Sequence, residues 1–308
     1  MIGLKASMIR FAVSLFTVCV LAFQVNAEHS EDDVPRTAIV SAFSPELVIL
    51  RDALMEPVTV SLNGVEFHQG KLDERDVVLF LSGIGTVNAA MTVQLALDHF
   101  DIEHVVFSGI AGGVDPALGI GDVVIADRWG QYLEVVMARP SAEGWAKPPF
   151  FEYPFANFGM IFPRAVSVQR AGSDEPETRF WFPVDQSLLT AARRALADLE
   201  LTPCTKGQDC LDRLPRILIG GAGVSGSAFV DNAEFRAYVF ETFNARVLDM
   251  ESAAVAHVAY ANEVPFIAVR SLSDLAGGEP DENGIRVFFG LAAQNAATAV
   301  RAILQEIP

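Results

Sequence analysis

The chain has 308 residues and a formal net charge of -17. After the N-terminal segment discussed below, about 280 residues remain, enough for one large domain with a well-buried core. An acidic surface repels phosphate backbones, so the composition argues against a nucleic-acid partner.

Residues 1–27 have the pattern of a secretory signal. Lys5 and Arg10 form a positive start, residues 11–23 are apolar, and Ala27 ends a small-residue cleavage sequence. We expect the mature chain to begin near Glu28, to be exported to the periplasm or the medium, and to have no membrane anchor. A membrane anchor is the alternative, but the apolar run of about 13 residues is shorter than the roughly 20 needed to span a bilayer. Lipidation at Cys19 is a weaker alternative, because residues 16–18 are a poor set before a lipidated cysteine.

The mature chain retains two cysteines and gains net negative charge. Removal of two basic residues and no acidic one changes the formal charge from -17 to -19. Cys204 and Cys210 lie close together in a polar stretch of loop composition. In an oxidising compartment this spacing favours a disulfide that closes a small loop, whereas a metal site would need further ligands nearby. We therefore expect a disulfide and no bound metal.

Short apolar segments rich in β-branched residues alternate with stretches of helical period. The predicted strands are 37–42, 77–81, 105–108, 122–126, 217–219, 246–248 and 266–271. The predicted helices are 45–54, 88–100, 188–199, 233–243, 252–262 and 290–305. Such alternation predicts an α/β fold: a single three-layer domain, residues 28–308, with a mixed, largely parallel twisted sheet flanked by helices. Sites in such folds gather at the carboxyl ends of the strands.

Residues 128–185 break this pattern. The segment is rich in proline and aromatic residues and lacks a clean period. Long loops inside a domain are usually functional or mobile, so we interpret it as an insertion that forms a lid or an oligomer contact. An irregular segment that only packs against the domain is an equally well supported alternative.

Two glycine-bearing stretches each follow a predicted strand. SGIGTVN, beginning at Ser82, falls short of a dinucleotide-binding fingerprint, because Asn88 occupies the third glycine position. SGIAGGV, beginning at Ser108, has small residues that would let backbone N–H groups approach a ligand. A tight turn after the strand explains this second stretch equally well.

Two acidic stretches follow later strands. LDMESAAVA places Asp249 and Glu251 at a strand–helix junction, where a carboxylate is often only a favourable N-terminal charge. The apolar residues around it imply burial, and a buried carboxylate needs a partner such as a pair of sugar hydroxyls. RSLSDLAGG begins at Arg270 and places Asp274 in a glycine-flanked loop, where a turn or cap aspartate is the ordinary interpretation.

In this order and spacing, the four stretches resemble the superfamily of purine nucleoside phosphorylases and methylthioadenosine/S-adenosylhomocysteine nucleosidases. The likeness runs from about Thr37 to the C-terminus and is closest to the exported branch that includes plant bark and vegetative storage proteins. The resemblance implies cleavage of the N-glycosidic bond of a purine nucleoside, without a metal or organic cofactor, by a homo-oligomer.

The resemblance also assigns roles to individual residues. Asp274 would protonate the purine as the bond breaks, held by Ser273, which requires a carboxyl pKa above its ordinary value. Glu46 would activate the attacking water, and Arg270 would orient Glu46 or that water. An ordinary first-turn glutamate and a structural ion pair are the alternatives for these two.

Further residues would bind the substrate. Glu251 would bind the ribose hydroxyls, with Met250 packed beneath the sugar. Phe229 would stack on the base, whose edge the backbone of Val230 would contact.

Ile110 and Gly112 would line the same site. However, Ile110 and Ser227 stand where the nucleosidases usually have a hydroxyl residue and an acidic residue. Those two departures leave the nucleophile and the base preference open.

Three functions remain at this point. A hydrolase would use water activated by Glu46. A phosphorylase would use phosphate as co-substrate and need a pocket built from Gly83, Gly85, residues 108–113 and at least one arginine. A nucleoside-binding or storage protein would keep the fold without turnover, although such a role makes no demand on Asp274, Glu251 and Glu46 together.

Overall fold

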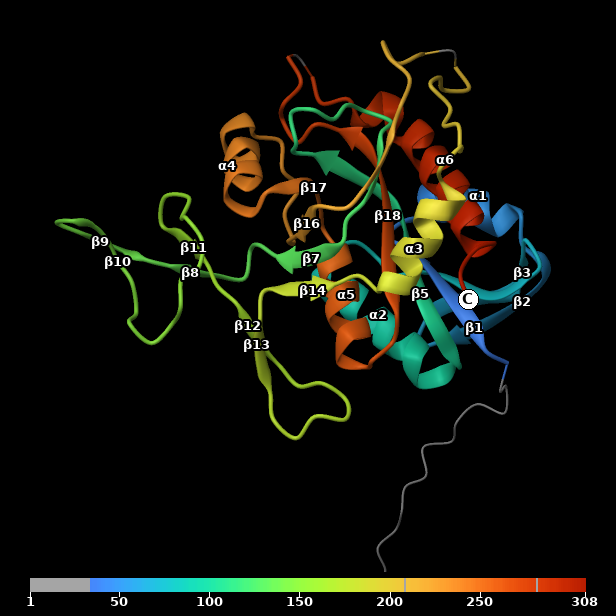
Figure 1. Ribbon diagram of the computed structural model, residues 1–308, viewed down its shortest axis with the longest axis horizontal. Coiled ribbons are helices and arrows are strands. Elements are labelled where there is room, and N and C mark those ends of the chain that lie inside the picture. Colours follow the sequence, from blue (N-terminus) through green and yellow to red (C-terminus); the bar gives the residue numbers. More distant parts are fainter. Residues whose placement is uncertain (1–33, 208, 281) are drawn as a thin grey trace, which may run out of the picture.

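The computed structural model describes residues 34–207, 209–280 and 282–308 (Figure 1). The predicted signal, residues 1–27, lies outside the described residues. The fold is a mixed sheet flanked by helices, as the alternation of strands and helices predicts.

The main sheet runs in the order β14-β7-β16-β17-β5-β1-β4-β3-β2, and β18, β6 and β15 branch from it. Its strands are β1 (Arg36–Ser41), β2 (Met55–Leu62), β3 (Val65–Leu72), β4 (Arg75–Leu81), β5 (Ile102–Gly113), β6 (Val123–Ile125), β7 (Arg128–Gln131), β14 (Trp181–Pro183), β15 (Ile217–Ile219), β16 (Ala222–Ser225), β17 (Ala245–Asp249) and β18 (Phe266–Asp274). The central strands β1, β4, β5 and β18 pair in parallel. They are buried on both faces, which is why they read as continuous apolar runs.

Five of the six helices of the described chain form two groups. The six are α1 (Ser44–Asp52), α2 (Thr86–His99), α3 (Gln186–Ala195), α4 (Ala233–Phe243), α5 (Ser252–Ala261) and α6 (Ile285–Leu304). Helix α6 contacts both α1 and α3, whereas α2 packs with α5 (Figure 1), and α4 packs on β17. Helix α6 is long and apolar enough to cross a membrane, but 56% of that stretch is buried. Its packing on β18 and β5 accounts for its apolar composition.

All seven predicted strands and six predicted helices are present, and three expectations need correction. Residues 108–113 are not a turn: they continue β5, because residues 108–112 pair with β18 and Gly112 and Gly113 pair with β17. Asp274 does not lie in a loop, since it is the last residue of β18. Helix α6 begins at Ile285, five residues before the predicted start at Gly290.

Residues 128–185 contain more regular structure than their sequence indicates. Strands β7 and β14, at the two ends of the segment, join the main sheet. Between them lie three antiparallel pairs, which project from the body in Figure 1. Their strands are β8 (Val135–Met137), β9 (Arg139–Ser141), β10 (Gly144–Ala146), β11 (Ile161–Pro163), β12 (Val166–Val168) and β13 (Glu177–Arg179). We call these projecting strands and their loops, residues 135–179, the arm.

Candidate active site

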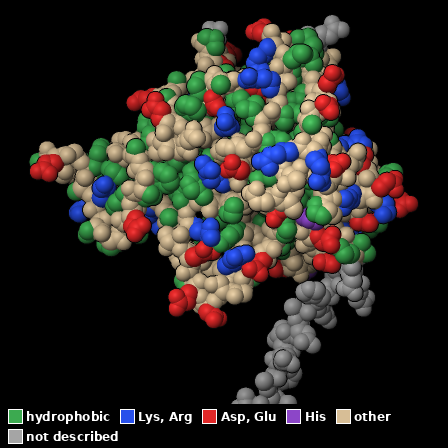
Figure 2. Space-filling model, in the orientation of Figure 1, with side chains coloured by type: hydrophobic (Ala, Val, Ile, Leu, Met, Phe, Trp, Pro, Cys, Tyr) green, Lys and Arg blue, Asp and Glu red, His purple; other side chains and the backbone are tan. Residues whose placement is uncertain are grey.

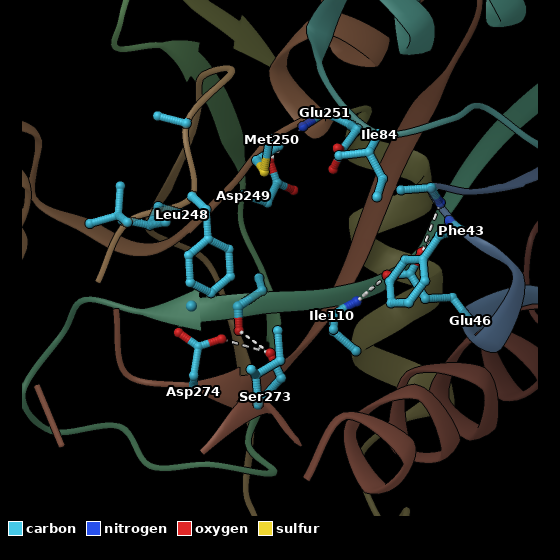
Figure 3. Close-up of a pocket in the computed structure, with 17 residues that line it drawn as sticks. Phe43, Glu46, Ile84, Ile110, Leu248, Asp249, Met250, Glu251, Ser273 and Asp274 are labelled. Atoms are coloured by element: carbon cyan, nitrogen blue, oxygen red, sulfur yellow. Dashed lines mark hydrogen bonds between the residues drawn. The ribbon is translucent and has the colours of Figure 1, made fainter. Parts of the chain in front are cut away.

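A pocket lies where β1, β5, β17 and β18 end (Figure 3). Glu46 stands in the first turn of α1, directly after β1, while Asp249 and Asp274 are the last residues of β17 and β18. Strand ends of this kind expose side chains at one edge of the sheet, which is where α/β folds place their sites. In Figure 3, Asp274 lies at one end of the pocket and Glu46 at the other.

Arg270 and Asp249 form a buried charged centre behind the pocket wall. The Arg270 guanidinium is fully buried, and its Nε donates to Asp249 Oδ2 at 2.7 Å and to Ser252 Oγ at 2.9 Å. Its Cζ atom lies 3.9 Å from the centre of the Phe107 ring, a cation–π contact. Asp249 also accepts from the backbone N–H groups of Glu251 and Ser252, both at 3.1 Å. This aspartate therefore joins the guanidinium to the start of α5.

Two further carboxyl groups lie near the same guanidinium. Arg270 Nη1 is 4.0 Å from Glu46 Oε1, and Nη2 is 3.7 Å from Glu251 Oε2. Neither terminal nitrogen has a hydrogen-bond partner among the described residues. Arg270 is absent from the described pocket wall, so the structure places it behind Glu46 and Asp249.

Glu46 is held by three backbone N–H groups. Ala42 and Phe43 donate to Oε2 at 2.8 and 3.1 Å, and Ile110 donates to Oε1 at 2.8 Å. Burial raises the pKa of the Glu46 carboxyl, and the Arg270 charge and these hydrogen bonds oppose that rise. A side chain at Gly109 would collide with both Arg270 and Glu46, so only glycine lets the two groups approach each other here.

Glu251 closes another side of the pocket. Its Oε1 accepts from the backbone N–H of Gly85 at 2.7 Å, which connects α5 to the loop before α2. Burial, and then the nearby negative charge of Asp249, raise the pKa of Glu251 to about 7. A carboxyl with this pKa exists in both protonation states near neutral pH.

Asp274 is buried and has two donors of its own. Ser273 Oγ lies 2.8 Å from Oδ2, and the backbone N–H of Ala276 donates to Oδ1 at 2.9 Å. Burial raises the pKa of Asp274, although these hydrogen bonds oppose the rise. Gly112 gives the carboxyl room, because a Cβ at that position would lie 3.1 Å from Oδ1.

Apolar side chains complete the wall of the pocket. Phe229 and Val230 follow β16, and Met250 lies between the two acidic residues of the strand–helix junction. Phe229 lines the pocket and is 58% exposed. Of the nine predicted active-site residues, Arg270 does not line this pocket. The other eight do: Glu46, Ile110, Gly112, Phe229, Val230, Met250, Glu251 and Asp274.

Sequence reasoning missed several residues of the site. Asp249 was noted only for its position, yet it is the hydrogen-bonding centre of the charged cluster, with Ser225 Oγ as another donor. Phe43, Ile84 and Ile285 also line the pocket. Only proximity to Glu46 in the sequence could have indicated Phe43, and nothing local indicates Ile285.

Ser227, where the family pattern usually has an acidic residue, contacts the loop before α2. Its Oγ lies 2.8 Å from Thr86 Oγ1 and 3.3 Å from the Thr86 backbone N–H. This contact connects the Phe229 segment to the segment that holds Glu251.

The structure contains the predicted disulfide between Cys204 and Cys210. Across the described residues, no group of three or more histidine, cysteine or acidic side chains could hold a metal ion.

Comparison with known proteins identifies the family. Residues 36–307 match the family described as "Phosphorylase superfamily". The chain belongs to this superfamily. Among its relatives are the 5'-methylthioadenosine/S-adenosylhomocysteine nucleosidases of Mycobacterium bovis and Mycobacterium tuberculosis, each 29% identical over 273 residues that cover 88% of this chain and 96% of the relative.

Solved structures of superfamily members share the fold. The nucleosidase of Neisseria meningitidis in complex with methylthio-immucillin-A is 26% identical with a TM-score of 0.65, covering 88% of this chain and 99% of that one. The Colwellia psychrerythraea nucleosidase in complex with adenine is 25% identical with a TM-score of 0.65, covering 91% and 97%. The futalosine hydrolase of Helicobacter pylori, 23% identical with a TM-score of 0.65 and covering 89% and 98%, shows the same fold.

Proposed function

We propose that this chain is a nucleosidase that hydrolyses the N-glycosidic bond of purine nucleosides. The observation that carries the proposal is the pocket itself, which has a buried carboxyl of raised pKa at each end, Asp274 and Glu46. One such group can give a proton to a leaving base while the other takes a proton from water. Nucleosidase relatives that match nearly their whole length support this assignment.

In the proposed mechanism, Asp274 is protonated and donates its proton to the purine N7 as the bond to C1' breaks. Ser273 holds the carboxyl in place. Phe229 stacks on the base, and the backbone of Val230 contacts its edge. The base leaves as a neutral molecule, which lowers the barrier compared with loss of an anion.

The sugar and the water occupy the rest of the pocket. Glu251 accepts the ribose hydroxyls above Met250, and its charge stabilises the oxocarbenium-like sugar. Glu46 takes a proton from the water that attacks C1', so the products are the free base and the free sugar. Arg270 is a positioning residue, since it holds Asp249 by a hydrogen bond and lies beside Glu46 and Glu251.

The geometry favours water over phosphate as the nucleophile. The backbone N–H groups of Gly85 and Ile110, which a phosphate pocket would use, already donate to Glu251 and Glu46. The described pocket wall contains no lysine or arginine. A phosphate dianion would therefore meet carboxylates where it needs donors.

The direct test is incubation of the purified protein with adenosine, inosine and methylthioadenosine, with and without phosphate, followed by chromatography of the base and the sugar. Base release without phosphate is the expected result. Release only with phosphate would replace hydrolysis by phosphorolysis. No release from any nucleoside would favour the binding or storage alternative.

Substitution Asp274→Asn tests the proposed acid. The amide cannot donate the carboxyl proton, so we expect a fall in kcat of about 10²–10⁴-fold, with an unchanged circular dichroism spectrum. An unchanged rate would contradict the mechanism.

We also propose that the chain is exported and that its signal, residues 1–27, is removed. The disulfide supports an oxidising compartment. N-terminal sequencing of protein recovered from the medium or the periplasm would test this; a mature start far from Glu28, or an intact leader, would contradict it.

A homo-oligomer is the last part of the proposal. Figure 2 shows hydrophobic side chains on the surface of the arm. Phe150, which belongs to the arm, is 77% exposed. Exposed apolar patches often mark interfaces between proteins. Light scattering on the purified protein should give a mass above 33.3 kDa, and a monomer at working concentration would contradict this part.

A further inference from the structure

A short segment joins Asp274, at the end of β18, to the start of α6. Its described residues, 275–280 and 282–284, contribute nothing to the described pocket wall. We call them the acid loop. The loop begins directly after the proposed acid and ends directly before Ile285, which lines the pocket. Its conformation therefore affects the position of both side chains.

The start of the acid loop has a backbone conformation that needs support. Ala276 donates its N–H to Asp274 Oδ1 at 2.9 Å, and its φ is 54°. A residue with a Cβ rarely adopts this left-handed region, and it does so where surrounding contacts hold it there. The hydrogen bond from Ala276 to the proposed acid therefore depends on contacts elsewhere in the loop.

Glu279 supplies contacts of this kind. Its Oε1 accepts from the backbone N–H of Leu275 at 2.7 Å and from the backbone N–H of Gly284 at 3.3 Å. One carboxylate therefore ties the two ends of the loop together. The shorter of these bonds goes to the residue that lies between Asp274 and Ala276 in the chain.

The chain before α4 holds the loop from its other side. The backbone N–H of Asn232 donates to the Ala276 carbonyl at 3.1 Å, and Asn283 Nδ2 donates to Asp231 Oδ1 at 3.1 Å. These contacts do not involve Glu279. A variant at position 279 can therefore fold with the loop still attached to the body of the protein.

The charge of Glu279 acts on Asp274 as well. Oε2 of Glu279 is buried and has no hydrogen-bond partner among the described residues, so water screens its charge weakly. Burial is the largest cause that raises the pKa of Asp274, and the nearby Glu279 charge raises that pKa further. A like charge beside a carboxyl favours its protonated form, which is the form that gives a proton to the base.

Other charged groups face the acid loop, but they are engaged elsewhere or exposed. On α4, the Arg236 guanidinium packs against Gly278, and its Nε donates to the Gly113 carbonyl at 3.0 Å. On β5, the residue paired with Asp274 is Gly112, which carries no charge. Three exposed charged residues, whose charges solvent screens, also adjoin the loop: Asp231, Glu282 and Arg286.

We propose that Glu279 is a positioning residue for the proposed cleavage, which fixes the acid loop behind Asp274 and favours the protonated form of that carboxyl. The inference rests on the proposed nucleosidase function and adds to it a residue outside the described pocket wall. Because Glu279 does not line the described pocket, it acts through Asp274 and Ala276.

Glu279→Gln separates the charge from the hydrogen bonds. The amide oxygen can accept from the same two N–H groups, whereas the negative charge is lost. The measurement is kcat/KM for methylthioadenosine from pH 5 to pH 9, in the native protein and the variant. Because the variant should ionise Asp274 more readily, we expect the native protein to be about three- to tenfold faster at the alkaline end. The two rates should converge toward the acidic end, where Asp274 is protonated in both.

A purely structural role of Glu279 would give a different result. It would lower the rate of Glu279→Gln by the same factor at every pH. A ratio of the two rates that does not change with pH, or equal rates throughout, would overturn the proposal.

Glu279→Ala removes the charge and both hydrogen bonds. We expect kcat to fall at least about threefold below that of Glu279→Gln at every pH, because Asp274 is held less firmly. Amide hydrogen exchange of the acid loop should become about three- to tenfold faster in Glu279→Ala and stay at the native rate in Glu279→Gln. Unchanged exchange in Glu279→Ala would overturn the role of Glu279 in fixing the loop.

Glu282→Gln is the matched control. It removes the same charge from an exposed position of the same loop, so neither the pH dependence nor the hydrogen exchange should change. An equal pH-dependent loss in Glu282→Gln and Glu279→Gln would overturn the assignment to Glu279.

The native protein separates the two levels of the argument. Cleavage by the native protein, without a pH-dependent difference for Glu279→Gln, would overturn the role of Glu279 and leave the nucleosidase intact. No base release by the native protein from adenosine, inosine or methylthioadenosine would overturn both.

Discussion

Arg270 and Arg179 make similar contacts in different surroundings. The Arg270 guanidinium lies 3.9 Å from the centre of the Phe107 ring, with Asp249 at 2.7 Å. Arg179 lies 4.5 Å from the centre of the Tyr260 ring, and its Nε is 2.8 Å from a glutamate. The first arginine is fully buried at the strand ends, while the side chain of the second, on the arm, is 34% exposed.

The carboxyl groups beside the two arginines respond in opposite ways. Burial raises the pKa of Glu46, and it raises the pKa of Glu251 to about 7, in spite of Arg270. At the surface, the Tyr260 hydroxyl and then Arg179 hold the pKa of Glu177 below its ordinary value. Solvent stabilises the exposed carboxylate, and its absence destabilises the buried ones. The same residue types therefore give carboxyl groups of raised pKa in one place and an ordinary surface ion pair in the other.

Arg270→Met should have the largest effect on stability. The substitution leaves Asp249, Glu46 and Glu251 close together without a counter-charge, and breaking a buried ion pair in this way costs about 3–5 kcal/mol. Denaturant unfolding at pH 7 measures the change. A loss below about 1 kcal/mol would mean that the carboxyls do not depend on Arg270, and that the two arginine sites differ less than burial implies.

Most of the site was predictable from the sequence, because its residues follow strands. Strands β1 and β18 both pair in parallel with β5 and end at one edge of the sheet, so topology brings Glu46 and Asp274 together. Glu251 follows β17, which meets the end of β5 in antiparallel register. The position of Arg270 was not predictable. Whether a strand residue faces the pocket or the layer behind it depends on pairing, which the sequence does not specify locally.

The fold, like the site, was predictable from the sequence only in part. The buried strands are continuous apolar runs and the helices have a clear period, but the β2–β3 hairpin was missed although Asn63 and Gly64 form a typical turn signal with positive φ. The three-residue strands of the arm are too short to produce a period. Pairing with neighbouring strands determines them instead.

Glu251→Gln should have an intermediate, pH-dependent effect. The folded state raises the pKa of Glu251 from its ordinary 4.5 to about 7, so neutral Glu251 adds stability below pH 4.5 that is lost as the pH rises through about 7. Glutamine is neutral at every pH. As the pH rises from 4.5 to 8, the free energy of unfolding of the variant should therefore increase by about 3 kcal/mol relative to that of the native protein. The increase is about 1.4 kcal/mol for each pH unit between the two pKa values.

Unfolding curves of both proteins across this range measure the difference. A difference that stays constant with pH would show that Glu251 titrates normally. Asp52→Asn, at the exposed end of α1, is the control and should show no such gain.

Arg179→Met should have the smallest effect. Its ion pair with Glu177 and its contact with Tyr260 are partly exposed to solvent, and ion pairs that solvent reaches add little to stability. We expect the unfolding midpoint to change by about 2 °C or less, and the change to disappear in high salt. Calorimetry of Arg179→Met beside Arg270→Met tests the comparison directly, since both substitutions remove a cation from an aromatic ring and a carboxylate. Equal losses of stability would contradict the role of burial. A large loss only for Arg270→Met would show that the contacts of Arg179 contribute less because solvent reaches them.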